Sequence, residues 1–108
     1  MNRWTLITSL SGSLKPKEFI LHNNYPNPFN PNTLLQYNLP EDRFVKITIH
    51  DILGRIIKNL VNKSQTVGYK SVKWNGTNNR NEKVSAGLYF YTIQAGDIRK
   101  TKKMILIK

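Results

Sequence analysis

Three prolines within the seven residues 25–31 restrict the fold more than any other feature of this chain. Each proline fixes its own φ and lacks a backbone N–H, and each residue before a proline is biased toward extended geometry. A helix and a central strand are therefore excluded here. We predict a stiff, extended bend in which Tyr25 and Phe29 lie against a sheet while Asn27 and Asn30 hydrogen-bond to nearby backbone. A loop that covers a sheet edge is the alternative, and the local chemistry favours it.

The size and composition of the chain restrict both its class and its partners. A length of 108 residues suits one domain with one core, and the absence of cysteine excludes disulfides and thiolate metal sites. Seventeen Lys and Arg against six Asp and Glu give a net charge of +11 and a pI near 10.1. This charge indicates attraction to anionic partners, which include nucleic acid, lipopolysaccharide and acidic membranes.

The N-terminal sixteen residues differ in composition from the remainder. No apolar run approaches the ~20 residues that span a bilayer, and residues 4–10 are only faintly similar to a signal peptide. We interpret residues 1–16 as a linker or the remnant of a preceding region, and residues 17–108 as the domain. If the protein is exported, we expect its export signal to lie outside this chain.

Alternating apolar and polar residues predict short strands separated by turns. Val45, Ile47 and Ile49 would face a core, while Lys46, Thr48 and His50 would face water. Turn signals follow at 51–54, 75–76 and 96–97, and polar loops are expected at 62–66 and 77–83. We therefore predict an all-β fold, a single Ig-like antiparallel β-sandwich of about seven strands. The predicted strands are 19–22, 33–39, 44–50, 55–61 (which has some helical character), 68–74, 87–93 and 98–107.

Residue types that carry catalysis are scarce. The only histidines are His22 and His50, the six acids lie mostly in turns, and residues 85–87 do not form a nucleophile elbow. We expect no enzyme activity, no cofactor and no metal site.

Basic residues that alternate with aromatic ones raise the possibility of an RNA-binding sheet, particularly at 89–91 and 99–103. However, Tyr89 and Tyr91 share one strand face and Phe90 takes the other, so at least one set belongs to a core. The lysine run is more typical of a solvated edge strand, and we expect no specific nucleic-acid partner.

In their order along the chain, these elements resemble the type A C-terminal sorting domain of the type IX secretion system of certain Gram-negative bacteria. The match covers nearly everything from Phe19 to Lys108. The same Ig-like fold is found in the flagellar hook-capping protein. The residues that make up the sorting motif are Tyr25, Pro26, Asn27, Pro28, Phe29, Asn30, Pro31, Gly54, Arg55, Trp74, Gly76, Gly87, Tyr89, Lys102, Lys103, Met104 and Lys108.

The resemblance implies that the folded domain, as a monomer, is recognised by the outer-membrane translocon, which sends attached cargo through the periplasm to the cell surface or medium. The terminal segment 102–108 would be the main recognition edge. A sortase-like peptidase would cut in the linker before Phe19 and attach the N-terminal cargo, which is absent from this chain, to anionic lipopolysaccharide. The alternative from another class is a stand-alone Ig-like structural or adhesive interaction module. A third, less favoured hypothesis is a protein that binds nucleic acid through its positive charge.

Overall fold

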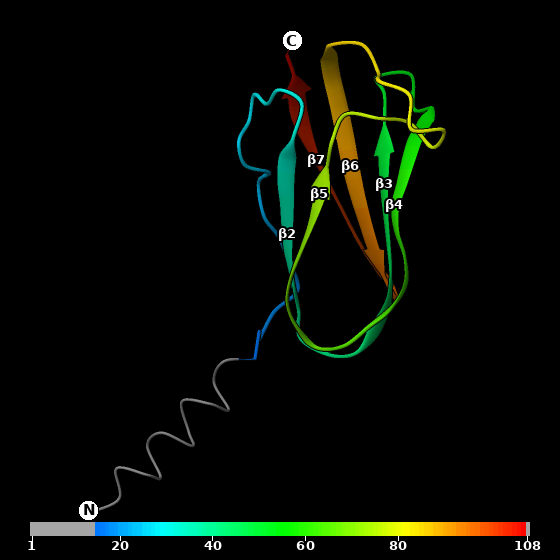
Figure 1. The fold of residues 1–108 in the computed structure, drawn as a ribbon. Coiled ribbons are helices and arrows are strands. Elements are labelled where there is room, and N and C mark those ends of the chain that lie inside the picture. Colours follow the sequence, from blue (N-terminus) through cyan, green and yellow to red (C-terminus); the bar gives the residue numbers. More distant parts are fainter. Residues whose placement is uncertain (1–14, 108) are drawn as a thin grey trace, which may run out of the picture.

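Two antiparallel β-sheets pack face to face in the computed structural model, which describes residues 15–107 (Figure 1). The first sheet has the strand order β1-β2-β5 and the second has the order β4-β3-β6-β7. The prediction of an all-β, Ig-like antiparallel sandwich is confirmed. The strands are β1 (Ile20–Leu21), β2 (Thr33–Leu39), β3 (Arg43–His50), β4 (Ile56–Gln65), β5 (Gly68–Trp74), β6 (Gly87–Ala95) and β7 (Ile98–Leu106).

The core forms between the sheets because alternate residues of each strand point to the same face. Val45, Ile47 and Ile49 of β3 are fully buried, as their spacing predicts. Thr48, which was predicted to face water, is only 8% exposed, because its neighbour across the ladder is Thr92 and the two shield each other. Other fully buried side chains are Leu35, Tyr37, Leu39, Trp74, Tyr91, Ile93 and Met104.

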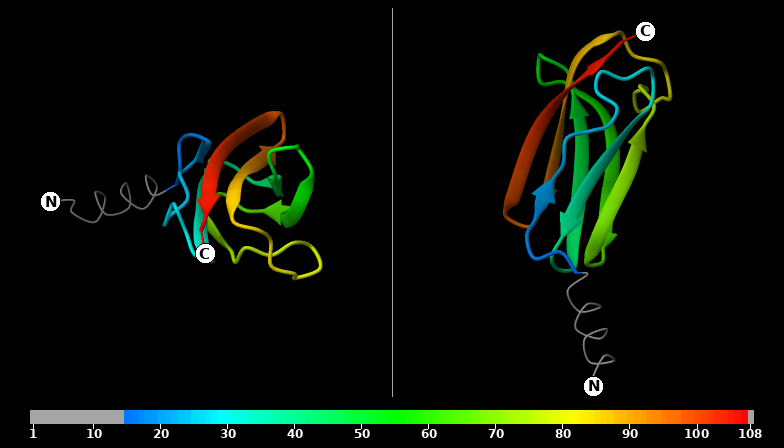
Figure 2. Two further views of the ribbon diagram at one scale, coloured as in Figure 1. Left: turned by 90° about the horizontal axis from the view of Figure 1, so that it is seen from above. Right: turned by 90° about the vertical axis from the view of Figure 1, so that its left-hand side faces the viewer.

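One end of the sandwich carries most of the irregular structure. Four parts of the chain lie there: the proline-rich residues 25–31, which we call the proline segment, the β3–β4 turn, residues 75–86 and the C-terminal end of β7. We call this end of the sandwich the distal end (Figures 1 and 2). The described chain begins at Lys15, at the opposite end. Neighbouring strands are antiparallel, so strand ends and turns must gather at these two ends.

The prediction of a loop at 62–66 is wrong, because β4 continues to Gln65. Asn62, Lys63 and Ser64 pair with residues of β3 in a continued ladder. β4 lies at the edge of its sheet, where polar side chains can face solvent while the backbone keeps its hydrogen bonds. Residues 56–61 also belong to β4, because pairing with β3 outweighs the local helical tendency noted for residues 55–61.

Replacing Trp74 with alanine should strongly destabilise the domain. The ring is 1% exposed, its Nε1 donates to the Thr77 carbonyl at 2.9 Å, and large-to-small changes of buried aromatics cost about 3–5 kcal/mol. Urea unfolding monitored by circular dichroism measures the loss. The matched control is Tyr69→Ala, on the same strand but 62% exposed, which should change stability by less than about 0.5 kcal/mol. An equal loss of stability from the two substitutions would show that the Trp74 ring is not packed in the core.

Candidate functional site

The proline segment pairs with the free edge of β7. The Phe29 N–H donates to the Ile105 carbonyl at 3.0 Å, and the Ile107 N–H donates to the Phe29 carbonyl at 2.9 Å. The Asn27 side-chain oxygen accepts from the Ile105 N–H at 3.0 Å. Phe29 and Leu106 thus form a parallel bridge. The prediction that the segment covers a sheet edge is confirmed, and so is the predicted backbone bond of Asn27. The corresponding prediction for Asn30 is wrong, since its side chain makes no hydrogen bond with the described residues.

A second set of bonds holds the start of the segment. Tyr25 and Leu34 exchange backbone hydrogen bonds of 3.0 and 2.8 Å, and the Tyr91 hydroxyl donates to the His22 carbonyl at 2.8 Å. Burial raises the pKa of Tyr91 to about 12, although a hydrogen bond from the Asn24 backbone acts in the opposite direction. The segment is therefore held at both ends. The peptide bonds before Pro26, Pro28 and Pro31 are cis.

The two aromatics of the segment have different environments. Phe29 is 1% exposed, whereas Tyr25 is 77% exposed. The prediction that Tyr25 packs against a sheet is wrong. Tyr25 is the bridge partner of Leu34, which lies on the outer face of its sheet, and paired residues share a face.

Motif residues distant in sequence meet around Trp74. Its ring centroid lies 5.6 Å from that of Phe29 and 5.4 Å from that of Tyr89. Gly76, at φ +73°, lies against Pro31, and a Cβ there would stand 3.4 Å from the Pro31 carbonyl oxygen, at ordinary contact distance. A side chain at this position would therefore be strained by the positive φ rather than by a clash. The structure brings together the proline segment, residues 74–76 and the C-terminal strand, which the sequence could only place separately.

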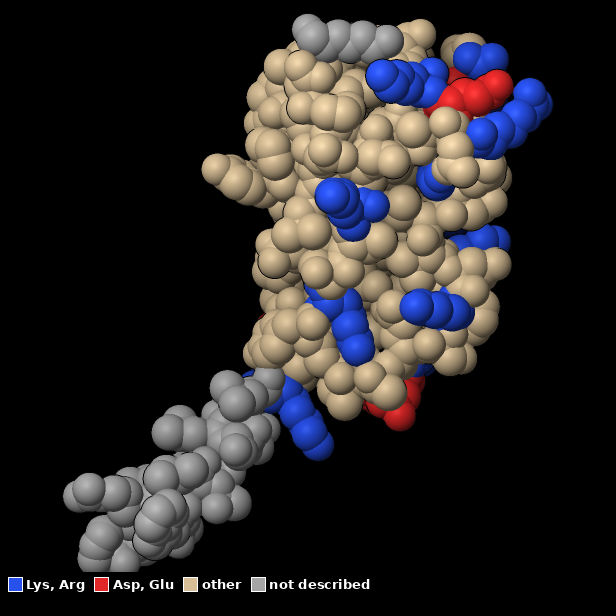
Figure 3. Space-filling view, in the orientation of Figure 1, with Lys and Arg blue, Asp and Glu red and all other residues tan. Residues whose placement is uncertain are grey.

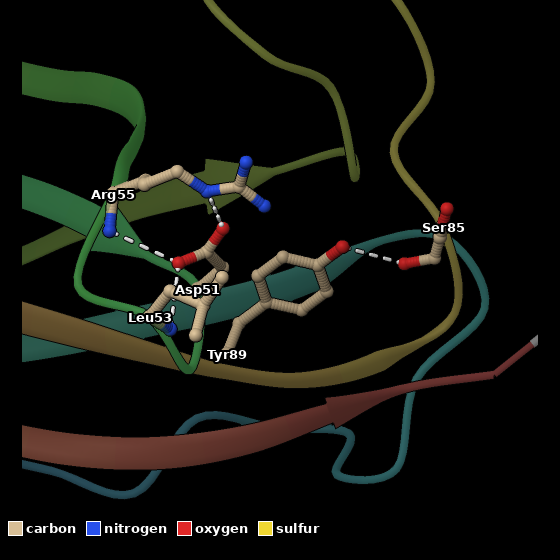
Figure 4. A network of polar contacts seen from close by, with 5 residues as sticks. All are labelled: Asp51, Leu53, Arg55, Ser85 and Tyr89. Atoms are coloured by element: carbon tan, nitrogen blue, oxygen red, sulfur yellow. Dashed lines mark hydrogen bonds and ion pairs between the residues drawn. The ribbon is translucent and has the colours of Figure 1, made fainter.

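The β3–β4 turn is held by Asp51 (Figure 4). One carboxylate oxygen accepts from the Leu53 N–H at 2.9 Å and the Arg55 N–H at 3.0 Å, and the other accepts from Arg55 Nε at 2.7 Å. Gly54 supplies the positive φ, +82°, that the turn requires. Beside this turn the Tyr89 hydroxyl donates to the Ser85 carbonyl at 2.6 Å. Gly54 and Arg55 thus have a structural role, and Asp51 completes it.

Partly exposed apolar side chains gather at the distal end. The turn places Ile52 and Leu53 in solvent, 68% and 73% exposed, and Leu88 and Ile105 are cross-strand partners on an outer face. We call this set the distal apolar surface. Sequence analysis did not single it out, although the alternation that buries Met104 and Leu106 also predicts that Ile105 and Ile107 face outward. Its members are Ile52, Leu53, Ile56, Leu88, Ile105 and Ile107.

The remaining motif residues occupy other places. Gly87 opens β6 opposite Leu106, and Met104 is fully buried in the core. Lys102 and Lys103 lie farther along β7 from the distal end, and Lys108 lies outside the described residues. Basic side chains are spread over the face seen in Figure 3 rather than gathered in one patch.

Within residues 15–107 there is no group of three metal-ligating side chains and no helix long and apolar enough to cross a membrane.

Comparison with known proteins identifies relatives of this fold. The family model of the FlgD Ig-like domain matches residues 31–97. The search of curated proteins found no match.

Several solved structures share the architecture, and three of them are informative. PorZ from Porphyromonas gingivalis, an essential surface component of the type IX secretion system, aligns with a TM-score of 0.57 and 19% identity over 82% of this chain and 11% of PorZ. Latent, dimeric PorU from the same organism gives a TM-score of 0.62 and 22% identity over 82% of this chain and 9% of PorU. FlgD from P. aeruginosa gives a TM-score of 0.55 and 18% identity over 85% of this chain and 73% of FlgD. The chain spans about a tenth of the length of PorZ and PorU, and these likenesses show a shared fold.

Acid should release the β3–β4 turn at a pH below the ordinary aspartate range. Desolvation alone would raise the pKa of Asp51, but the bonds from Arg55 and Leu53 and the charge of Arg55 outweigh it and lower the pKa. The stabilisation is therefore present above the unfolded value of about 3.9 and is lost as the pH falls through the lowered pKa. Amide chemical shifts of Leu53 and Arg55, followed from pH 6 downward, should show a midpoint below about 3.9.

The matched variant for this titration is Asp51→Asn, which keeps an acceptor oxygen but does not titrate, so the transition should disappear. A midpoint at or above the ordinary aspartate value would show that the bonds to Arg55 do not form in solution.

Proposed function

The chain belongs to the FlgD Ig-like domain family, and we propose that within this family it acts as a C-terminal sorting domain of the type IX secretion system. The ordered sorting motifs support this role, and the fold is one that PorZ, a component of that system, also contains. In this proposal the translocon recognises the folded domain and carries attached cargo from the periplasm to the cell surface or medium. The domain itself performs no catalysis.

The convergence of the motifs at the distal end carries the proposal. Phe29, Trp74 and Tyr89 pack together there and fix the end of β7 next to the distal apolar surface. Leu53 and Leu88, two members of this surface, line one hollow, and exposed apolar side chains that lie together are typical of interaction sites. The described chain begins at the opposite end, so cargo joined before residue 15 would leave this surface accessible (Figure 2).

The proposal assigns a distinct partner to each region of the chain. The translocon would contact the distal apolar surface and the neighbouring part of β7. A sortase-like peptidase would cut before Phe19, a buried residue that marks the start of the packed domain. Attachment of the released cargo to anionic lipopolysaccharide would follow, and the net charge of +11 suits the approach to such a surface.

A stand-alone Ig-like structural or adhesive module is the second candidate. The family match favours it, because the matching family model is that of the FlgD Ig-like domain, and the FlgD structure aligns over 73% of its own chain. Such a module would not depend on a translocon.

Secretion of a fusion separates these functions. Residues 14–108 joined to an exported fluorescent protein should bring fluorescence to the surface or medium only in a host with an intact type IX translocon. Ile107→Asp, at a position 46% exposed, should reduce that signal at least about fivefold with little change in melting temperature, because it places a charge in an apolar contact. Tyr69→Asp, on the outer face of the other sheet, is the control and should secrete normally.

Deletion of residues 104–108 is a poorer test, since it also removes Met104 and Leu106 from the core. Retention of the folded, unsubstituted fusion in the periplasm would reject the sorting role and favour the stand-alone module.

A further inference from the structure

The proline segment covers only the C-terminal part of the β7 edge. Ile105 and Ile107 direct their N–H groups to it, and the ladder between β6 and β7 has no register shift. Alternation therefore directs the backbone N–H and C=O groups of Arg99, Thr101 and Lys103 to the same side. Within the described residues these groups have no hydrogen-bond partner, and all three residues are exposed. We call this stretch the open edge.

A shallow groove accompanies the open edge. Thr101, Lys102 and Lys103 form one side of it, with Phe90 from the neighbouring strand. Asn23 and Asn27, on the segment that leads into and through the prolines, form the other side. An extended chain laid along β7 would find backbone donors and acceptors on one flank and asparagine amides on the other. The stretch from Arg99 to Lys103 has room for about five residues, or roughly 16 Å of strand.

The positive charge of the open edge indicates which kind of chain could bind there. Arg99, Lys100, Lys102 and Lys103 follow one another on β7, and the ion pairs found among the described residues, at Asp51 and Glu41, involve none of them. Lys100 is bound instead to the Phe19 carbonyl, at 3.1 Å. A second copy of this chain would place like charges opposite each other, which disfavours edge-to-edge pairing. An acidic strand would place opposite charges there.

We infer that the open edge binds an extended, acidic segment of a protein partner by strand addition, as an extra strand of the β4-β3-β6-β7 sheet. This inference deepens the proposed function. It rests on that function only because we attribute the acidic segment to the secretion machinery. Backbone bonds would supply the pairing, and the basic side chains would select acidic sequences.

Binding of a model peptide to the purified full chain tests the inference without any secretion assay. The probe is a capped seven-residue peptide of alternating threonine and glutamate, and its fully N-methylated analogue keeps the charge but cannot donate hydrogen bonds. The first should bind at least tenfold more tightly than the second by calorimetry. On saturation, amide exchange at Thr101 and Lys103 should slow at least tenfold, whereas exchange at Ile105, which already donates to Asn27, should not change.

A matched pair of variants isolates the backbone donor. Thr101→Val and Thr101→Pro both remove the hydroxyl bond to Thr92, but only proline removes the N–H of the open edge. Proline should weaken peptide binding at least tenfold relative to valine, with both variants folded by their amide spectra. Any of three results would overturn the inference. The two variants could bind the peptide with equal affinity, the N-methylated peptide could bind as tightly as the unmodified one, or the protein could form concentration-dependent dimers that the proline variant abolishes. Failure here with normal secretion of the fusion would leave the sorting role intact.

Discussion

Phe29 connects the two sheets through two different kinds of interaction, and the distal end depends on both. Its backbone bonds to Ile105 and Ile107 on the edge of β7, while its ring packs on Trp74 of the opposite sheet. The ring fixes the depth of the segment and the backbone fixes its register. Trp74 in turn packs against Tyr89 of β6, so the cluster also contacts the second sheet from inside the core. Loss of any one of these contacts would loosen the others.

Two asparagines cover exposed sheet edges in this structure. A sandwich of two open sheets exposes strand edges that can pair with other chains. Asn27 covers part of the β7 edge with its side chain, and Asn79 does the same for β4, donating its N–H to the Ile57 carbonyl and accepting from the Asn59 N–H. Short amides suit this task, because they imitate the peptide groups of a missing strand.

Local patterns were sufficient to predict most of the fold but not the assembly of the site. The alternation in β3 and the Asp51–Gly54 turn chemistry are properties of neighbouring residues, and both predictions held. The polar end of β4 carries no apolar signal, because an edge strand needs none, and it was taken for a loop. The proline segment could be identified as an edge cover, yet its partner strand could not, since that pairing is a tertiary contact. The outward direction of Tyr25 likewise depends on its pairing with Leu34.

The bond between Asn27 and Ile105 joins residues 78 positions apart, near the two limits of the packed domain. Contacts of such separation form late, because the chain between them must first lose its freedom. Within this domain, a ribosome makes the proline segment before β2 and makes β7 after the other six strands. Until Ile107 has emerged, Phe29 lacks its backbone partners and the core lacks Met104 and Leu106. The domain can therefore be completed only after β7 has been made, and its finished distal end reports that synthesis has passed Ile107.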